Sequence, residues 1–292
     1  MSSFSTHWLA LREPLDASSR AARLVGLLRE ALGDRPSQHA RAEIIDLGAG
    51  TGANLRYAAP LLAGAQDWLL VERDPLLLAA TRQQIRAWSR STQCHFTASG
   101  AQLAVQGERF ECRVRSLALD LAVQLDRLPL HRGVLLTASA LLDLVSEPWL
   151  RMLMRRAAAV GAAVWFTLTY DGRIDCDPVE AEDQAVRELV NQHQRSDKGF
   201  GLALGPGAAS TAAEILGEHG YRVHCAPSDW CLGADHAALQ YALVEGWFEA
   251  ACEIAPTRTG MLRAWRKLRR AHIDDGRSSL RVGHVDMVGR PG

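Results

Sequence analysis

The chain has 292 residues, of which 48% are hydrophobic and 23% charged, and its formal net charge at pH 7 is zero. This length suits one elaborated domain, or one domain with a cap, and the composition is that of an ordinary globular protein. The balanced charge gives no reason to expect nucleic acid or another anionic partner.

The first residues contain no basic stretch followed by an apolar one, and no apolar run reaches the ~18 residues of a membrane span. The six cysteines form no C-x-x-C pair and have no histidine at zinc spacing: Cys94, Cys112, Cys176, Cys225, Cys231 and Cys252. We therefore expect a cytoplasmic protein with reduced thiols, no membrane association and no metal site.

Residues 1–40 are expected to form a helical N-terminal segment. Apolar residues recur at mostly helical spacing over residues 7–33, and Pro14 interrupts them, which predicts two short helices before the first strand. Two interpretations remain open for these helices. They are an amphipathic cover for the sheet, or they are a lid whose Trp8 and Arg12 face the substrate.

The most informative stretch runs from Glu43 to Leu55, where an apolar run ends in Asp46 and is followed by glycines at alternate positions. This pattern predicts a buried strand, a tight turn and the beginning of a helix. Glycines let such a turn adopt left-handed dihedrals and let a ligand approach the backbone, and the helix N-terminus offers free N–H groups. A nucleotide-binding loop is expected here.

Two kinds of nucleotide-binding loop fit this stretch of sequence. Gly48-x-Gly50-x-x-Ala53, with Glu72 about twenty residues later, satisfies the dinucleotide-binding fingerprint. The same stretch, taken as Asp46-x-Gly48-x-Gly50-x-Gly52, resembles the first motif of the class I S-adenosylmethionine-dependent methyltransferases. Asp46 favours the second resemblance, because the nicotinamide version usually has an apolar residue at that position.

The resemblance implies S-adenosylmethionine as cofactor and several cofactor-binding positions. The acid at Asp46 lies near the cationic methionine end, and the loop contributes the following residues: Gly48, Ala49, Gly50, Gly52 and Asn54. The apolar run Trp68 to Val71 predicts a second strand that delivers Glu72 to the ribose hydroxyls, with Arg73 beside it.

Asp74-Pro75 predicts the beginning of a helix that runs to about Ser89, and residues 90–108 are read as a loop or small hairpin. Phe110 to Leu119 is the expected third strand. Asp120 and Leu121 at its end resemble the family's adenine-contacting positions.

Gly133 to Thr137 is the expected fourth strand, whose exit would place Ser139 beside the cofactor. Asp143 then lies either at the substrate wall or at the surface as a solvated or capping acid. Ala162 to Leu168 is the expected fifth strand, and it would deliver Tyr170 and Arg173 to the same edge of the sheet. The alternative is a plain turn at Asp171-Gly172.

Residues 174–207 are dense in polar groups and are expected to form a substrate-binding cap. Its candidate residues are His193, Asp197 and Lys198, because an aromatic (Phe200) next to a solitary lysine suits docking better than solvation.

Beyond the cap we expect a helix over 208–219, a sixth strand over 220–225, and a helical insertion at 237–272. The second helix of that insertion, from residue 259 to 272, is basic, which indicates a solvated face or, alternatively, a nucleic-acid patch. Residues 280–288 are expected to form a closing antiparallel edge strand.

The expected fold is therefore α/β: a doubly wound, seven-stranded, mostly parallel sheet with an antiparallel last strand, helices on both faces, and residues 41–292 as the Rossmann-like domain. The resemblance implies methyl transfer by in-line displacement. The absence of the N/D-P-P-Y/F and Pro-Cys signatures of nucleic-acid methyltransferases favours a small-molecule or peptide-like acceptor. Alternatives are a catalytically silent cofactor-binding protein and an NAD(P)-dependent oxidoreductase.

If the acceptor carries a proton, a base is needed, and the candidates are His193, Tyr170 and Asp143. An acceptor carboxylate or phosphate could be held by cations, for which Lys198, Arg173 and Arg12 are the candidates. Trp8 and Asp197 complete the expected substrate-binding set.

Overall fold

The fold is organised around the strand that precedes the glycine loop. In the computed structural model, which describes residues 5–32 and 41–292, β1 (Ala42–Leu47) is buried at every position except Glu43. Its side chains enter two different cores, since Ile44 packs on one face of the sheet and Ile45 on the other. A strand covered on both faces has the continuous apolar pattern seen in the sequence.

The described residues form one ten-stranded sheet in the order β3-β4-β5-β2-β1-β6-β7-β10-β8, with β9 paired to β10. Besides β1, the strands are β2 (Gly64–Glu72), β3 (His95–Ser99), β4 (Gln102–Gln106), β5 (Phe110–Ala118), β6 (Leu135–Ser139), β7 (Ala163–Asp177), β8 (Tyr221–Pro227), β9 (Trp230–Leu232) and β10 (Ser279–Pro291).

The centre of the sheet is parallel and its two margins are antiparallel. Strands β5, β2, β1, β6 and β7 run in one direction, whereas β10 runs against both β7 and β8. The mostly parallel α/β fold with an antiparallel last strand is confirmed.

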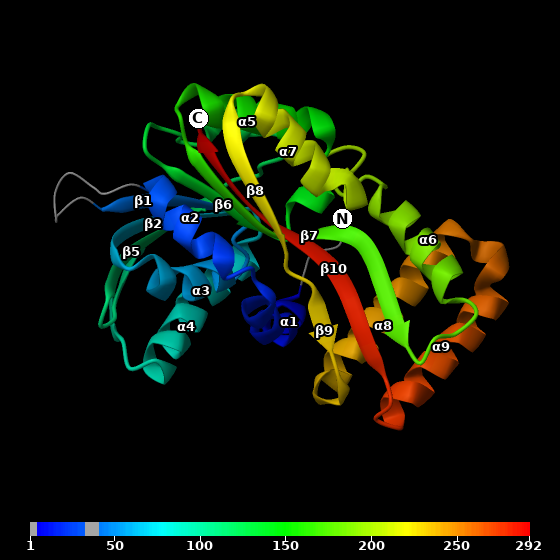
Figure 1. Ribbon diagram of the computed structural model, residues 1–292. Coiled ribbons are helices and arrows are strands. Elements are labelled where there is room, and N and C mark those ends of the chain that lie inside the picture. Colours follow the sequence, from blue (N-terminus) through cyan, green and yellow to red (C-terminus); the bar gives the residue numbers. More distant parts are fainter. Residues whose placement is uncertain (1–4, 33–40) are drawn as a thin grey trace.

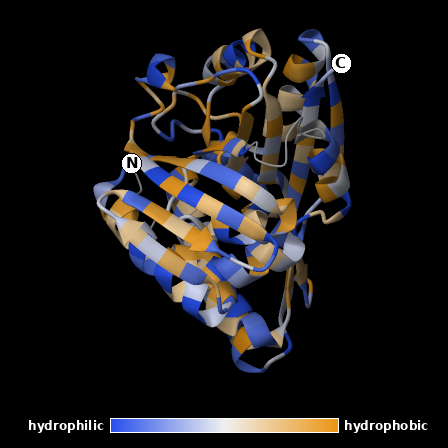
Figure 2. Ribbon diagram, turned by 90° about the vertical axis from the view of Figure 1, so that its left-hand side faces the viewer, coloured by the Kyte–Doolittle hydropathy of each residue, from blue (hydrophilic) through white to orange (hydrophobic). Residues whose placement is uncertain are grey.

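Two predictions about the sheet are wrong. It has ten strands rather than seven, because residues 95–106 form the β3–β4 hairpin beyond β5 and because β9 adds a short strand on β10. The last strand also lies inside the sheet, between β7 and β8, and not at its edge. Figure 2 shows the hydrophobic and hydrophilic residues that alternate along the strands at the hairpin end of the sheet.

Helices cover both faces of the sheet (Figure 1). One core is closed by α2 (Arg23–Leu32), α3 (Ala53–Leu62) and α4 (Pro75–Ser91). The opposite core is closed by α5 (Glu147–Ala159) and α7 (Ala208–Glu218). This arrangement is the doubly wound architecture that the alternation of strands and helices predicts.

The third core lies beyond the parallel sheet, in the helical region formed by residues 174–207 and 237–274, which we call the cap. Strands β7 and β10 continue as a long antiparallel pair, and three helices pack on this arm and on one another: α6 (Asp183–Gln194), α8 (Ala237–Ile254) and α9 (Thr259–Asp274). The segments expected as a cap and as a helical insertion therefore form one helical layer.

The N-terminal helices differ from the prediction at Pro14. Helix α1 (Thr6–Ser19) continues through Pro14, and the chain bends instead at Arg20, whose backbone is extended. Of the expected segment 1–40, residues 1–4 and 33–40 lie outside the described residues. Within the described ranges, no helix combines the length and apolar character needed to cross a bilayer.

Candidate functional site

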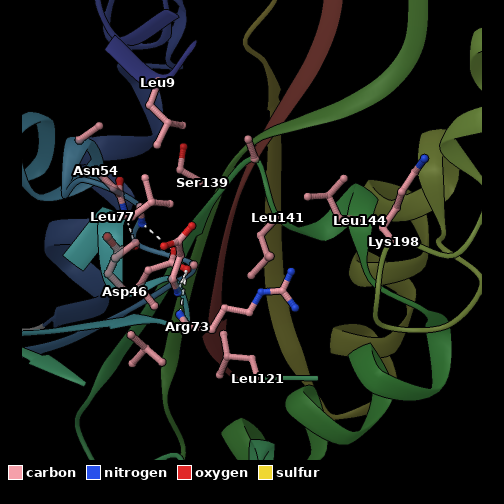
Figure 3. A pocket seen from close by; sticks show the side chains of 18 of the residues that line it. Leu9, Asp46, Asn54, Arg73, Leu77, Leu121, Ser139, Leu141, Leu144 and Lys198 are labelled. Atoms are coloured by element: carbon pink, nitrogen blue, oxygen red, sulfur yellow. Dashed lines mark hydrogen bonds between the residues drawn. The ribbon is translucent and has the colours of Figure 1, made fainter. Parts of the chain in front are cut away.

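A cavity of about 510 Å³ opens at the carboxyl ends of β1, β2, β5 and β6 (Figure 3). In doubly wound sheets, ligands bind at this edge. The cavity collects most of the residues expected in the site from six separate regions of the chain: Arg12, Asp46, Gly48, Ala49, Gly50, Asn54, Glu72, Arg73, Asp120, Leu121, Ser139, His193, Asp197 and Lys198.

The glycine loop forms one wall and needs its glycines for conformation and for space. Gly48 and Gly50 have φ values of 61° and 55°, which residues with a side chain rarely adopt. A Cβ at Gly50 would lie 3.3 Å from Leu9 Cδ1, inside the cavity. Gly52 does not line the cavity, because it caps the N-terminus of α3 at φ 80°.

Asp46 is a buried carboxyl group with one oxygen left free. Its Oδ1 accepts a hydrogen bond from Asn54 Nδ2 at 2.7 Å, while Oδ2 has no partner. Burial raises the pKa of Asp46 to about 7, and the hydrogen bond from Asn54 and the charge of Arg20 oppose that rise. An unpartnered buried carboxyl oxygen beside a ligand cavity is a place where a cationic ligand group would be stabilised.

Arg20 lies next to Asp46 and was not expected in the site. Its Nη1 donates to Asn54 Oδ1 at 2.5 Å and its Nη2 to Ser139 Oγ at 3.0 Å. The guanidinium also stacks over the ring of Tyr57 at 4.4 Å. Burial lowers the pKa of Arg20. The only signal in the sequence is a cation at the bend between two helices, which does not by itself indicate a site.

Glu72 fixes the loop as well as facing the cavity. Its carboxylate accepts three backbone N–H groups, from Gly50 at 3.0 Å, Arg73 at 2.8 Å and Asp74 at 3.0 Å. These bonds hold the end of β2 against the glycine loop and aim the carboxylate at the space between them.

The next strand end supplies Asp120 and Leu121. Asp120 Oδ1 accepts from the N–H of Ala122 at 3.0 Å, and its other oxygen lies 3.8 Å from Arg73 Nη1. Arg73 and Asp120 therefore form an ion pair in the cavity wall where the adjacent strands β2 and β5 end.

The cap contributes a second polar group of residues at the opposite side of the cavity. In Figure 3, Lys198 lies across the cavity from Asp46, with Leu141 and Leu144 between them. His193 Nε2 lies 3.0 Å from Glu253 Oε2, and Lys198 Nζ lies 3.3 Å from His193 Nδ1. Glu253 was not expected, because an acid on the predicted helix 237–254 carries no local signal.

Asp197 lines the cavity but is occupied with the shape of its own loop. Its Oδ1 accepts the N–H groups of Gly199 at 2.6 Å and Gly201 at 3.1 Å. These bonds fold the loop that presents Lys198.

Helix α1 closes the cavity from a third side. Arg12 lines it and is held by Asp16 through two hydrogen bonds, of 2.9 and 3.2 Å, while the Trp230 ring lies 4.9 Å from the guanidinium carbon. Trp8 does not line the cavity, because it packs against the core of the cap.

The structure also does not bring Tyr170 or Arg173 into the cavity. Tyr170 is buried in the cap core, where its hydroxyl donates to Asn191 Oδ1 at 2.7 Å. Arg173 is an exposed cation bound by Asp171 and Asp229. Both misplacements have one cause: β7 continues to Asp177, so these residues lie inside a strand and not at its end. The alternative of a turn at Asp171-Gly172 is wrong for the same reason.

Asp143 lies in a short 3-10 helix (Leu142–Leu144) and is buried beneath the cavity wall. Burial raises the pKa of Asp143 to about 6. A solvated acid does not describe its position, and its side chain is not among those that line the cavity.

No protein-family model matches the chain, and no curated protein matches it. Among solved structures it is similar to the cyclopropane synthase MmaA2 from Mycobacterium tuberculosis, with 11% identity, a TM-score of 0.45, and 92% of this chain and 83% of that chain covered. It is also similar to phosphoethanolamine N-methyltransferase 2 from Haemonchus contortus, with 12% identity, a TM-score of 0.44, and coverages of 98% and 57%. Because these TM-scores are below 0.5, a function for this chain has to come from its own site.

Proposed function

We propose that this protein is an S-adenosylmethionine-dependent methyltransferase acting on a small-molecule or peptide-like acceptor. The observation that carries the proposal is the cavity in which a buried Asp46, the glycine loop and Glu72 meet at the carboxyl ends of neighbouring parallel strands. Two features fit the cofactor. Asp46 Oδ2 has no partner, and Gly50 in the loop beside it has a φ of 55°, which a residue with a side chain rarely adopts.

Each end of the cofactor has residues suited to hold it. Glu72 would accept hydrogen bonds from the ribose hydroxyls, and Asp120 with Leu121 would flank the adenine. Asp46 would stabilise the cationic methionine end, where Ser139 and Arg20 also line the cavity. A guanidinium at that position suits the methionine carboxylate.

The strand order favours this cofactor over a nicotinamide. The doubly wound dinucleotide fold has its six strands in the order 3-2-1-4-5-6, all parallel. Here β10 runs against its two neighbours, between the fifth parallel strand β7 and β8. The resemblance seen at Asp46 predicts such an antiparallel last strand.

Bound S-adenosylmethionine would supply a methyl group already activated on a sulfonium. The chain then has to align the acceptor ~3 Å from that methyl carbon and to exclude water. The apolar side chains between the two polar ends of the cavity suit both tasks: Leu9, Leu141, Leu144 and Phe200.

Thermal unfolding with each ligand tests the cofactor. S-adenosylhomocysteine at 100 times its dissociation constant should stabilise the protein by ~2.7 kcal/mol, whereas NAD and NADP should not. No shift with S-adenosylhomocysteine contradicts the proposal. A labelled methyl-transfer screen of cell extract then separates an enzyme from a catalytically silent protein, which would bind the cofactor and label nothing.

A further inference from the structure

The cap side of the cavity contains three hydrogen-bonded groups that lead from the cavity outwards. Lys198 lies on the loop after α6, His193 in the last turn of α6, and Glu253 near the end of α8. All three line the cavity; the His193 side chain is 23% exposed, whereas that of Glu253 is 69% exposed.

The chemistry of the three groups fixes the direction of their hydrogen bonds. An ionised carboxylate can only accept, so Nε2 of His193 is the donor in its contact with Glu253. Lys198 Nζ lies 3.3 Å from His193 Nδ1 and 3.5 Å from Nε2. In the tautomer that carries its hydrogen on Nε2, Nδ1 is the nitrogen that can accept an N–H from Lys198. Both ring nitrogens of His193 are engaged, and Lys198 is the member that can accept a proton from a ligand without first breaking a hydrogen bond.

We propose that Lys198 is the general base of the reaction and that His193 and Glu253 relay its proton to solvent. This inference rests on the proposed methyl transfer. It replaces His193 by Lys198 as the group that touches the acceptor, and it makes His193 and Glu253 positioning residues.

The proton balance is as follows. The acceptor nucleophile X–H attacks the methyl carbon, the C–S bond breaks with its electron pair on sulfur, and the X–H proton passes to the neutral Nζ of Lys198. The resulting ammonium donates a proton to His193 Nδ1, and the Nε2 proton of His193 passes to the Glu253 carboxylate and then to water.

The surroundings of Lys198 favour this role. Burial lowers the pKa of Lys198, and the Glu253 carboxylate opposes that shift. The other charged groups that line the cavity near it are Asp197 on the same loop, and the mutually paired Arg12 and Asp16 on α1. A lowered pKa increases the share of the neutral amine, which is the form that can accept a proton.

The relay also defines the class of acceptor. A base is required only when the methylated atom carries a proton that must leave, as in a hydroxyl group or a primary or secondary amine. A tertiary amine or a thioether gains a methyl group without losing a proton, so these are not expected as acceptors.

The first test is kinetic and uses the full chain, labelled S-adenosylmethionine and the acceptor fraction isolated from cell extract. Lys198→Arg keeps the cation but cannot release its proton, so we expect kcat to fall about 100-fold or more, with the rise of kcat with pH abolished and affinity for S-adenosylhomocysteine unchanged. Glu253→Gln should shift the pH profile. Lys267→Arg, which changes the other lysine of the chain, is the matched control.

Two results overturn the relay. If Lys198→Arg keeps the rate and pH profile of the unaltered protein, Lys198 serves only as a positive charge. If Lys198→Met raises KM and leaves kcat unchanged, Lys198 binds an anionic part of the acceptor. In both cases the unaltered protein still transfers methyl groups, whereas failure of the proposed function would appear as no binding of S-adenosylhomocysteine.

A second test needs no acceptor, because the chain contains only two lysines, Lys198 and Lys267. Reductive methylation with ¹³C-formaldehyde gives one NMR signal for each, and Lys267→Arg assigns them. We expect Lys198 to titrate at lower pH than Lys267, and at still lower pH in Glu253→Gln. Titration of Lys198 together with Lys267 would contradict the relay.

Discussion

At the scale of single residues, the two polar ends of the cavity are built differently. Asp46 is buried, with a free oxygen and a raised pKa, whereas the Glu72 carboxylate accepts three backbone N–H groups that fix its direction. Asp46 is therefore suited to respond to the charge of a ligand, and Glu72 is suited to hold a ligand in position.

Asp46 should make cofactor affinity depend on pH. With a pKa of about 7, the group is protonated below pH 7 and ionised above it, and only the ionised form attracts a sulfonium. We expect the affinity for S-adenosylmethionine, measured by calorimetry, to rise up to about tenfold per pH unit below pH 7 and to level off above it.

S-adenosylhomocysteine has no sulfonium, so its affinity should change less over the same range. Asp46→Asn should remove the difference between the two ligands' pH profiles. Parallel profiles in the unaltered protein would contradict this role of Asp46.

Gly50→Leu should abolish cofactor binding. The side chain would need a positive φ of 55°, and it would project toward Leu9 inside the cavity. The measurement is the thermal shift with S-adenosylhomocysteine. Gly217→Ala, on the exposed end of α7 with open space around it, is the control and should keep the full shift.

At the scale of elements, a buried ion pair joins two helices of the cap. Arg269 of α9 is fully buried and donates to Asp183 at the start of α6, which also accepts the Nε1–H of Trp265 at 2.8 Å. The pair therefore fixes the packing of α9 against α6, and α6 carries His193.

Asp183→Ala should destabilise the protein by about 3 kcal/mol, because it leaves the Arg269 guanidinium buried without a carboxylate. Urea unfolding measures the effect. Adding Arg269→Met to Asp183→Ala should recover a large part of the loss, since the unpaired charge is then gone. Additive losses in the double variant would show that the charge pair is not the cause.

Elements with local sequence signals could be predicted, whereas features that depend on contacts between distant segments could not. The strand, loop and helix around Asp46 were predicted because glycine requirements and apolar periodicity are local. The end of β7 was not predicted, because Gly172 in the sequence indicates a turn. In the structure Gly172 lies within the strand, where a Cβ would be 2.8 Å from Pro206. Arg20 and Glu253 reach the site only through the packing of distant helices.

At the scale of the whole molecule, the cavity is enclosed by three parts of the chain: the parallel sheet, helix α1 and the cap. Arg12 and Leu9 come from α1, and Lys198 and Phe200 from the cap loop. A ligand that fills the cavity therefore contacts segments that lie far from the glycine loop along the chain.

Hydrogen exchange should show this enclosure. We expect S-adenosylhomocysteine to slow amide exchange in the glycine loop and in α1, and acceptor together with S-adenosylhomocysteine to slow it also in residues 195–204 of the cap. Exchange in the β3–β4 hairpin, far from the cavity, is the internal control. Protection limited to the glycine loop would argue against a closed cavity.

The interior position of β10 has a consequence for how the chain folds. Strand β8 forms its sheet hydrogen bonds with β10, and β10 is the last strand in the order of synthesis. The five parallel strands can assemble as they leave the ribosome, but β8 has to wait, with its backbone groups exposed, until residues 285–291 arrive. We expect nascent chains stopped before residue 279 to be recognised by chaperones, although the glycine loop and the five parallel strands are already complete.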